Sequence, residues 1–388
     1  MKWKRLIGGI LAAICLVPAP TWAVRAEGLT SDAKSAILME LETGKVLYEA
    51  DIHKQLEPAS MTKMMGMYLI FEAIENGLLR WDEMVRVSDH AASLGGSQIY
   101  LKPGEEMSVD DLFKSVAIAS ANDSITALGE RIAGSEEAFV ERMNEKARLL
   151  GMSNTVFKNP TGLSDEAHVT TAYDMAILAR ALLLDFPDVL QYTSLYEDWI
   201  RNDTESPFWL VNTNKLLKAG LDVDGLKTGF TQRAGYNLTA TAKRDGMRVI
   251  SVVMGASKSD VRSREVAALI SHAFSTYELI RKVDPDVVVG TKYNMLARNR
   301  QFEVVTMDAI SVLKDRLEPE GEASHEIEIF SDLELPLAPG DEVGRLTYFY
   351  NGEEYRTIGL TVSQNVEKNS FLGLFSYMVS QLLFGGNH

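Results

Sequence analysis

Three short motifs in this chain combine residue types that could transfer an acyl group. They are Ser60-Met61-Thr62-Lys63, Ser120-Ala121-Asn122 and Lys227-Thr228-Gly229, in that order. Together they supply a serine nucleophile, two lysines that can tune each other's protonation, and donors for a carbonyl and a carboxylate. Each motif is short enough to recur by chance, as Ser31-Asp32-Ala33-Lys34 does. The prediction of an acyl-transferring site therefore depends on the order of the motifs and on their spacing of roughly 60 and then 100 residues.

The first two motifs predict a nucleophile with its proton acceptor and relay. Lys63 should lie beside Ser60, because residues three apart share a helix face. Burial and the neighbouring charge of Lys227 would keep Lys63 neutral, so that it can take the serine proton. Ser120 would relay a proton to the leaving amine, and Asn122 would hold Lys63 or the substrate amide. The alternative for Ser120 and Asn122 is helix capping.

The third motif is predicted to lie on a strand that forms one wall of the active-site cleft. An extended substrate could pair with the strand edge, and Gly229 would allow its close approach. Lys227 and Thr228 could then receive a terminal carboxylate. The alternative is an exposed edge strand protected by a lysine. His168 is interpreted as a structural or solvated histidine, because lysine already supplies the base.

The N-terminus has the three regions of a secretory signal peptide. Lys2, Lys4 and Arg5 precede an apolar run over residues 6–17, and small residues follow up to Ala23 and Ala26. That run is shorter than the roughly 20 residues of a membrane span. We therefore expect residues 1–26 to be removed and the protein to reach the extracytoplasmic face of the membrane. Cys15, the only cysteine, would leave with them, which excludes disulfides and a thiol nucleophile.

The C-terminus predicts a helix that lies on a membrane surface. Residues 370–384 are apolar except for a narrow polar stripe of Asn369, Gly373, Ser376 and Ser380. At about 1.5 Å per residue this helix is too short to cross a bilayer, but its wide apolar face suits the interface. The alternative is a helix docked on the protein's own core or on a dimer partner.

Length and periodicity predict an α/β (α+β) protein, with 46% apolar residues and a net charge of −15. An antiparallel sheet is expected from a hairpin over 36–49 and strands over 224–231, 236–242 and 247–254. A helical block over 60–184 and a helix over 260–281 would cover it. The predicted catalytic domain spans 27–282, a small β-sandwich-like domain 283–366 and the amphipathic anchor helix 367–388. The acidic charge argues against nucleic-acid binding, and we expect no metal or cofactor.

The three motifs resemble those of the penicillin-recognising serine acyltransferases. The whole mature chain is similar to the D-alanyl-D-alanine carboxypeptidases of the low-molecular-mass penicillin-binding type, serine peptidase family S11. The resemblance also covers the 36–49 hairpin and the following segments: Glu57-Pro58-Ala59-Ser60, Thr171-Ala172-Tyr173-Asp174-Met175, Asn212-Thr213-Asn214-Lys215-Leu216-Leu217, Asp224-Gly225-Leu226-Lys227-Thr228-Gly229-Phe230 and Ala234-Gly235-Tyr236-Asn237-Leu238.

The resemblance implies a substrate and roles for several residues. Ser60 would attack the carbonyl between the two D-alanines of a peptidoglycan stem pentapeptide, the last D-alanine would leave, and water would release the tetrapeptide. Penicillin would acylate the same serine. The amide of Phe230 would be a second oxyanion donor, and Lys215 or Arg262 would contact the substrate carboxylate.

Two rival functions remain open at the level of sequence. Class A β-lactamases share the three motifs, but they resemble one another in having a single domain with a Glu-x-x-x-Asn deacylating loop. In this chain Glu141-Arg142-Met143-Asn144 has the wrong spacing for that loop. An inactive wall-binding scaffold of the same fold is disfavoured because Ser60, Lys63, Asn122 and Lys227 are all present.

Overall fold

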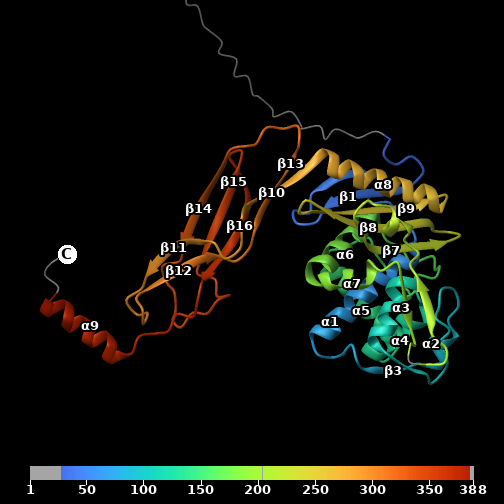
Figure 1. Ribbon diagram of the computed structural model, residues 1–388, viewed down its shortest axis with the longest axis horizontal. Coiled ribbons are helices and arrows are strands. Elements are labelled where there is room, and N and C mark those ends of the chain that lie inside the picture. The colour runs from blue at the N-terminus through green and yellow to red at the C-terminus, as the bar shows by residue number, and fades with distance from the viewer. Residues whose placement is uncertain (1–27, 203, 385–388) are drawn as a thin grey trace, which may run out of the picture.

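The computed structural model describes residues 28–202 and 204–384. The predicted signal peptide, residues 1–26, lies outside them. In Figure 1 a large mixed α/β part occupies one end of the molecule, and a slender group of strands leads away from it to a terminal helix. The predicted mixed architecture is confirmed.

A five-stranded antiparallel sheet forms the centre of the large part, in the order β2-β1-β9-β8-β7. The strands are β1 (Ser35–Glu40), β2 (Val46–Ala50), β7 (Val223–Thr231), β8 (Gly235–Arg244) and β9 (Met247–Ala256). The predicted hairpin and three later strands are therefore confirmed. β1 is buried throughout, as expected for a strand covered on both faces. β7 is last in the order, so one of its edges has no neighbouring strand in the described sheet.

Two apolar clusters hold helices on opposite faces of this sheet. One joins Ile37, Met39 and Val252 to the helical block, and the other joins Ala36, Leu38 and α8. The alternation of β1 side chains between the clusters follows from the two-residue period of a strand. The helices of the block are α1 (Lys63–Glu75), α2 (Asp89–Ser93), α3 (Val109–Ala119), α4 (Asn122–Ala133), α5 (Glu136–Leu149), α6 (Ala172–Asp185) and α7 (Leu190–Thr193).

The predicted helix over 260–281 is wrong at its end. α8 spans Ser259–Thr276, and the chain then forms strand β10 (Tyr277–Val283). β10 pairs with β13 (Ile310–Asp315), with Leu279 opposite Leu313. Pairing with a distant segment decides between helix and strand here, since the β-branched and aromatic residues of 277–283 suit a half-buried strand.

The slender part contains a second antiparallel sheet, in the order β11-β12-β16-β15-β14. Its strands are β11 (Val288–Tyr293), β12 (Gln301–Thr306), β14 (Ala323–Ile329), β15 (Gly344–Tyr350) and β16 (Glu353–Val362). Asn351-Gly352, a typical two-residue turn sequence, connects β15 to β16: both residues have positive φ, and Tyr350 pairs with Glu353. The short hairpins β3 (Met84–Arg86) with β4 (Glu106–Ser108) and β5 (Glu197–Ile200) with β6 (Phe208–Val211) were not predicted.

The last described element is α9 (Phe371–Phe384), at the far end of the second sheet from the large part of the molecule (Figure 1). Among the described residues, no helix has the length and apolar character needed to cross a bilayer. Phe371 and Leu372 are 82% and 77% exposed. The side chain of Ser380, part of the predicted polar stripe, lies outside the described residues.

Candidate active site

Ser60 lies in a tight turn that directly precedes α1. Residues Ala59–Thr62 form a 3₁₀ turn, so the predicted helix start at Ser60 is a 3₁₀ start, and the α-helix proper begins at Lys63. Ala59 has a φ of 48°, a conformation that costs energy for a residue other than glycine. The Lys63 ammonium nitrogen is 3.0 Å from Ser60 Oγ, as the three-residue spacing predicts.

Three neighbouring segments clamp the turn that carries Ser60. Asn237 on β8 donates from Nδ2 to the carbonyls of Glu57 and Pro58, at 3.0 and 3.2 Å. A Cβ added to Gly162 would lie 1.9 Å from the Ala59 carbonyl oxygen, and one added to Gly229 would lie 2.6 Å from that of Pro58. Only glycine therefore permits both contacts, and the predicted close approach at Gly229 is made by the nucleophile turn itself.

Lys63 is completely buried, and its nitrogen has three partners. It contacts Ser60 Oγ at 3.0 Å, Asn122 Oδ1 at 2.7 Å and the Thr161 carbonyl oxygen at 2.7 Å. The amide and carbonyl oxygens can only accept, so they take both N–H groups of a neutral amine. The lone pair is then left for the Ser60 hydroxyl. Ser60 Oγ also lies 3.4 Å from the Thr161 carbonyl, so its shorter contact is with Lys63.

The electrostatic surroundings favour a neutral Lys63. Burial, and then the charge of Lys227, hold the pKa of Lys63 well below its usual value, while Asp123 opposes them. Burial also lowers the pKa of Lys227 to about 7, helped by the guanidinium of Arg262. The structure thus brings Lys63 and Lys227 close enough to influence each other, as the sequence predicts.

Ser120 and Asn122 lie at the junction between α3 and α4. Ser120 ends α3 in the left-handed conformation, with φ 64°, and Asn122 is the first residue of α4. Asn122 donates from Nδ2 to the Gly95 carbonyl at 2.7 Å, which fixes its Oδ1 toward Lys63. Ser120 Oγ is buried, with no hydrogen-bond partner among the described residues. Neither side chain caps a helix in this structure.

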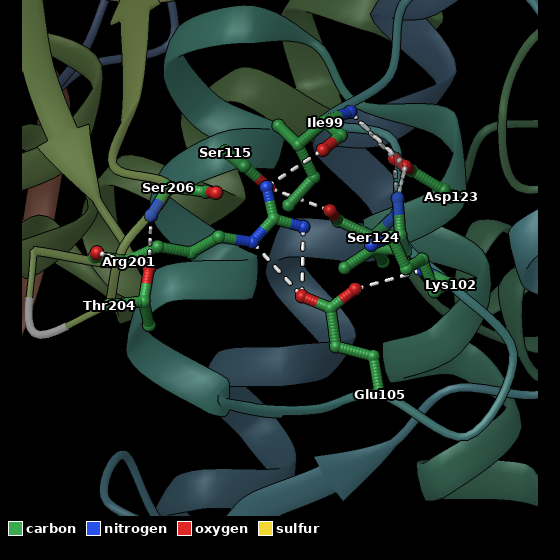
Figure 2. A network of polar contacts seen from close by, with 10 residues as sticks. Ile99, Lys102, Glu105, Ser115, Asp123, Ser124, Arg201, Thr204 and Ser206 are labelled. Atoms are coloured by element: carbon green, nitrogen blue, oxygen red, sulfur yellow. Dashed lines mark hydrogen bonds and ion pairs between the residues drawn. The ribbon is translucent and has the colours of Figure 1, made fainter.

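A polar network beside Asn122 fixes the loop over residues 95–105. Asp123 accepts from the amides of Ile99 and Leu101, each at 3.1 Å. Arg201, at the end of β5, contacts Glu105 and the Ile99 carbonyl, each at 2.9 Å (Figure 2). The network therefore holds the loop that supports Asn122 between α4 and the β5–β6 hairpin. No local sequence pattern predicts the contacts of Arg201, because its partners are about 100 residues away.

Thr161 contributes a backbone contact to Lys63 that the motifs do not predict. Its carbonyl contacts Lys63, and Asn159 Oδ1 holds the surrounding turn by accepting from the amides of Thr161, Gly162 and Leu163. Asn159-Pro160-Thr161-Gly162 is a turn-forming sequence, which was the available signal. A backbone carbonyl has no residue-type signature, so the contact itself could not be anticipated.

The predicted carboxylate-binding residues separate in the structure. Thr228 Oγ1 lies 2.5 Å from Thr213 Oγ1. Lys215 begins the short 3₁₀ helix η3 (Lys215–Lys218) with an exposed side chain, so the contact to the third motif comes from Thr213. Arg262, on α8, is buried, its Nε has no partner among the described residues, and its charge acts on Lys227. Arg262 thus belongs to the site, whereas the structure gives Lys215 no described contact with it.

Phe230 and His168 occupy the margins of the site. Phe230 is half exposed and stacks on Tyr236, with ring centroids 4.3 Å apart. His168 accepts at Nδ1 from the Lys158 amide, and its Nε2 is 2.9 Å from Thr62 Oγ1. Burial lowers the pKa of His168 to about 4. His168 is therefore a neutral structural residue, one of the two interpretations made from the sequence.

The remaining candidates are explained by local structure. Asn144, in the segment weighed as a β-lactamase loop, makes three backbone contacts, with Val140 and Phe157. It thus connects α5 to the following loop. Within the described residues, no group of three histidine, cysteine, aspartate or glutamate side chains is placed to hold a metal ion.

Because the hydroxyl of half-buried Ser60 meets the amine of buried Lys63, with buried Lys227 on the edge strand β7, the fold and site define a serine acyl-transferring enzyme of the penicillin-binding fold. Residues 22–258 match the family model described as D-alanyl-D-alanine carboxypeptidase, peptidase family S11, and the chain belongs to this family. It is therefore a serine-type carboxypeptidase, as predicted, rather than a β-lactamase or a scaffold.

Relatives that match nearly the whole chain belong to the same family. The D-alanyl-D-alanine carboxypeptidase DacF of Bacillus subtilis is 42% identical, over 95% of this chain and 96% of its own length. DacC of Escherichia coli is 35% identical over 96% and 95%. Among solved structures, penicillin-binding protein 5 of Haemophilus influenzae has a TM-score of 0.70, with 29% identity over 87% and 98% of the two chains. Ampicillin-bound penicillin-binding protein D2 of Listeria monocytogenes has a TM-score of 0.57, with 35% identity over 62% and 97%.

Proposed function

We propose that Ser60 is the nucleophile that cleaves D-alanyl-D-alanine in peptidoglycan stem pentapeptides. Neutral Lys63 takes the hydroxyl proton while Ser60 Oγ bonds to the carbonyl carbon between the two D-alanines. The C–N bond then breaks, and the departing D-alanine nitrogen receives a proton through Ser120, whose buried hydroxyl is otherwise unpaired. Water next attacks the ester on Ser60 and releases the tetrapeptide. The observation that carries this proposal is the Lys63 nitrogen with two acceptor-only partners and one hydroxyl.

Backbone amides would stabilise the oxyanion of each tetrahedral intermediate. The amides of Ser60 and Phe230 are the proposed donors, and the contact of Gly229 with the Ser60 turn supports their convergence. The substrate would extend along the free edge of β7. Its terminal carboxylate would lie near Thr228 and Thr213, within the positive field of Lys227 and Arg262.

Penicillins would acylate the same serine. The Listeria monocytogenes relative is known in ampicillin-bound and cefotaxime-bound forms, which supports β-lactam binding by this chain. Fluorescent penicillin tests the nucleophile: the native protein should carry a stable adduct, and Ser60→Ala should carry none. Release of D-alanine from a pentapeptide should disappear in the same variant. An adduct of undiminished yield on Ser60→Ala would overturn the assignment.

The protein would act at the extracytoplasmic face of the membrane, anchored by α9. Phe371, Leu372, Phe375, Met378 and Leu383 are all more than half exposed, so the slender domain leaves this apolar face uncovered. An exported carboxypeptidase would meet its wall substrate there. Deletion of residues 370–388 should move the protein from the membrane fraction to the soluble fraction while penicillin labelling persists. Retention of the shortened chain by membranes would contradict the anchor.

A further inference from the structure

A loop of the slender domain lies directly against the start of α9. Residues 294–300 connect β11 to β12, and the Leu296 carbonyl accepts from the Asn369 amide at 2.7 Å. Ala297 also forms a β-bridge with Lys368. These contacts hold the loop beside the start of the helix, so a surface that receives α9 also lies close to the loop.

This loop exposes apolar side chains beside the apolar face of α9. Met295 and Leu296 are each 49% exposed, although neighbouring Ala297 is completely buried. Two adjacent exposed apolar residues at a loop tip resemble the feature that α9 presents, on a separate element. The loop thus extends the apolar surface beyond the helix.

Basic residues are concentrated in the segments that carry this apolar surface, although the protein as a whole is acidic. Segments 291–300 and 364–384 carry Lys292, Arg298, Arg300 and Lys368 against a single acidic residue, Glu367, whereas the whole chain has a net charge of −15. Arg300 lies over the ring of Tyr377 on α9, 3.3 Å from its centroid. Arg298 remains 69% exposed at its side chain despite its contact with Glu367.

We propose that the 294–300 loop is a second membrane-contacting element, which inserts Met295 and Leu296 beside α9 while the nearby basic residues bind anionic phospholipid headgroups. Exposed apolar residues with lysine and arginine nearby in the same segments match the boundary between acyl chains and anionic headgroups. Two contacts on different elements would also fix the orientation of the slender domain on the bilayer. The inference rests on the proposed anchoring by α9.

Vesicle binding by the purified protein tests the loop. Met295→Ser/Leu296→Ser should weaken binding to vesicles of phosphatidylcholine and phosphatidylglycerol at least tenfold, since two half-exposed apolar side chains no longer insert. Leu317→Ser is the matched control, because Leu317 is 94% exposed but follows β13, next to the catalytic part. It should bind as the native protein does. Penicillin labelling should be the same in all three proteins.

The role of the basic residues is tested by comparing vesicles with and without an anionic phospholipid. Arg298→Gln/Lys368→Gln should reduce the preference for phosphatidylglycerol-containing vesicles over pure phosphatidylcholine vesicles about tenfold, and salt should have the same effect on the native protein. Equal binding of the native protein to both vesicles would overturn the headgroup assignment.

The outcomes separate the loop from the anchor. If deletion of 370–388 abolishes vesicle binding but Met295→Ser/Leu296→Ser binds normally, the loop inference fails and the anchor stands. If the native protein does not bind vesicles, both fail. A native dimer that the loop variant converts to a monomer would assign this surface to a second copy of the chain and overturn the membrane assignment.

Discussion

The partners of Lys63 decide which protonation state can activate Ser60. An ammonium group would donate to all three neighbours and leave no acceptor for the serine proton. A neutral amine satisfies Asn122 and Thr161 with its two hydrogens and keeps its lone pair for Ser60. Burial and the charge of Lys227 lower the pKa of Lys63 and thus supply the state that this geometry needs.

Removal of Lys63 should greatly slow acylation without unfolding the protein. Lys63→Ala should slow penicillin acylation by about 10²–10⁴-fold, the usual contribution of a general base, with a native circular dichroism spectrum. The matched control is Lys34→Ala, in the chance copy of the motif, where the lysine is exposed. Labelling of Lys63→Ala at the native rate would assign the base elsewhere.

A carboxylate in place of Asn122 should shift the pH dependence of acylation. Asn122→Asp places a negative charge about where Oδ1 now lies, 2.7 Å from the Lys63 nitrogen, which stabilises the ammonium and raises the pKa of Lys63. Because the reactive form is neutral, the acidic limb of the acylation rate should move at least about one unit to higher pH. Asn76→Asp, at the exposed end of α1, should leave the profile unchanged. An unshifted profile for Asn122→Asp would show that Lys63 does not titrate in this limb.

For single residues, the sequence predicts contacts made by side chains better than contacts made by backbone groups. Ser60, Lys63, Ser120, Asn122 and Lys227 were predicted because their residue types and spacing have a chemical meaning, and the structure places Ser60, Asn122 and the charge of Lys227 around Lys63. The Thr161 carbonyl was missed because every residue carries one. Lys215 was proposed for its charge, but it lies outside the described contacts, and uncharged Thr213 takes the position beside Thr228.

Two glycines with the same positive φ allow the cost of backbone strain to be distinguished from the effect of the contact with the Ser60 turn. Gly162 and Gly151 both have a φ of +79°, but only Gly162 lies against another backbone, the Ala59 carbonyl. Gly151→Ala should cost about 1–2 kcal/mol of stability from the left-handed conformation alone and leave labelling intact. Gly162→Ala should cost more and should also slow penicillin acylation, because the Ser60 turn must shift. Equal stability losses with equal labelling would mean that the Gly162 contact does not position Ser60.

His168 should make stability depend on pH, because it ties the 158–168 loop to the turn before α1. Its pKa is lowered from the usual 6.5 to about 4, so the folded protein binds fewer protons than the unfolded chain between these values. The contribution to stability is complete above pH 6.5 and declines as the pH falls to 4, by about 1.4 kcal/mol per unit. Denaturant unfolding should detect this slope and its reduction in His168→Gln. An identical slope in the variant would assign it to other groups.

Elements with strong local periodicity were predicted, and those that depend on distant partners were not. The strands β7, β8 and β9 and the block helices show their period in the sequence. Residues 277–281 continue an apolar pattern that a helix could also use, and only pairing of Leu279 with Leu313 makes them a strand. The β5–β6 hairpin was missed for a similar reason, since Arg201 is fixed by Glu105 and the Ile99 carbonyl.

The two parts of the molecule pack against each other along an interface, the seam between β10, β13 and α8, which the sequence does not predict. β10, which follows the last catalytic helix, pairs with β13, and Leu313 packs in the same cluster as Val266 and Leu269 of α8. Arg316 donates to the carbonyls of Phe274 and Tyr277, at 3.2 and 3.0 Å. The predicted domain boundary after residue 282 coincides with the end of β10 at Val283, but the packing between the two parts continues beyond it.

Because the two parts pack together here, we predict that buried Leu313 of the slender domain stabilises the catalytic part. Leu313→Ala should lower the temperature at which penicillin labelling is lost by about 5–15 °C, because a buried leucine contributes about 2–5 kcal/mol and the catalytic part has some 250 residues. Leu346→Ala is the matched control: Leu346 is equally buried, but it packs within the second sheet's own core. It should leave that temperature nearly unchanged. Equal losses in both variants would mean that the two parts unfold as a single unit, and no loss in Leu313→Ala would mean that the catalytic part is stable without the seam.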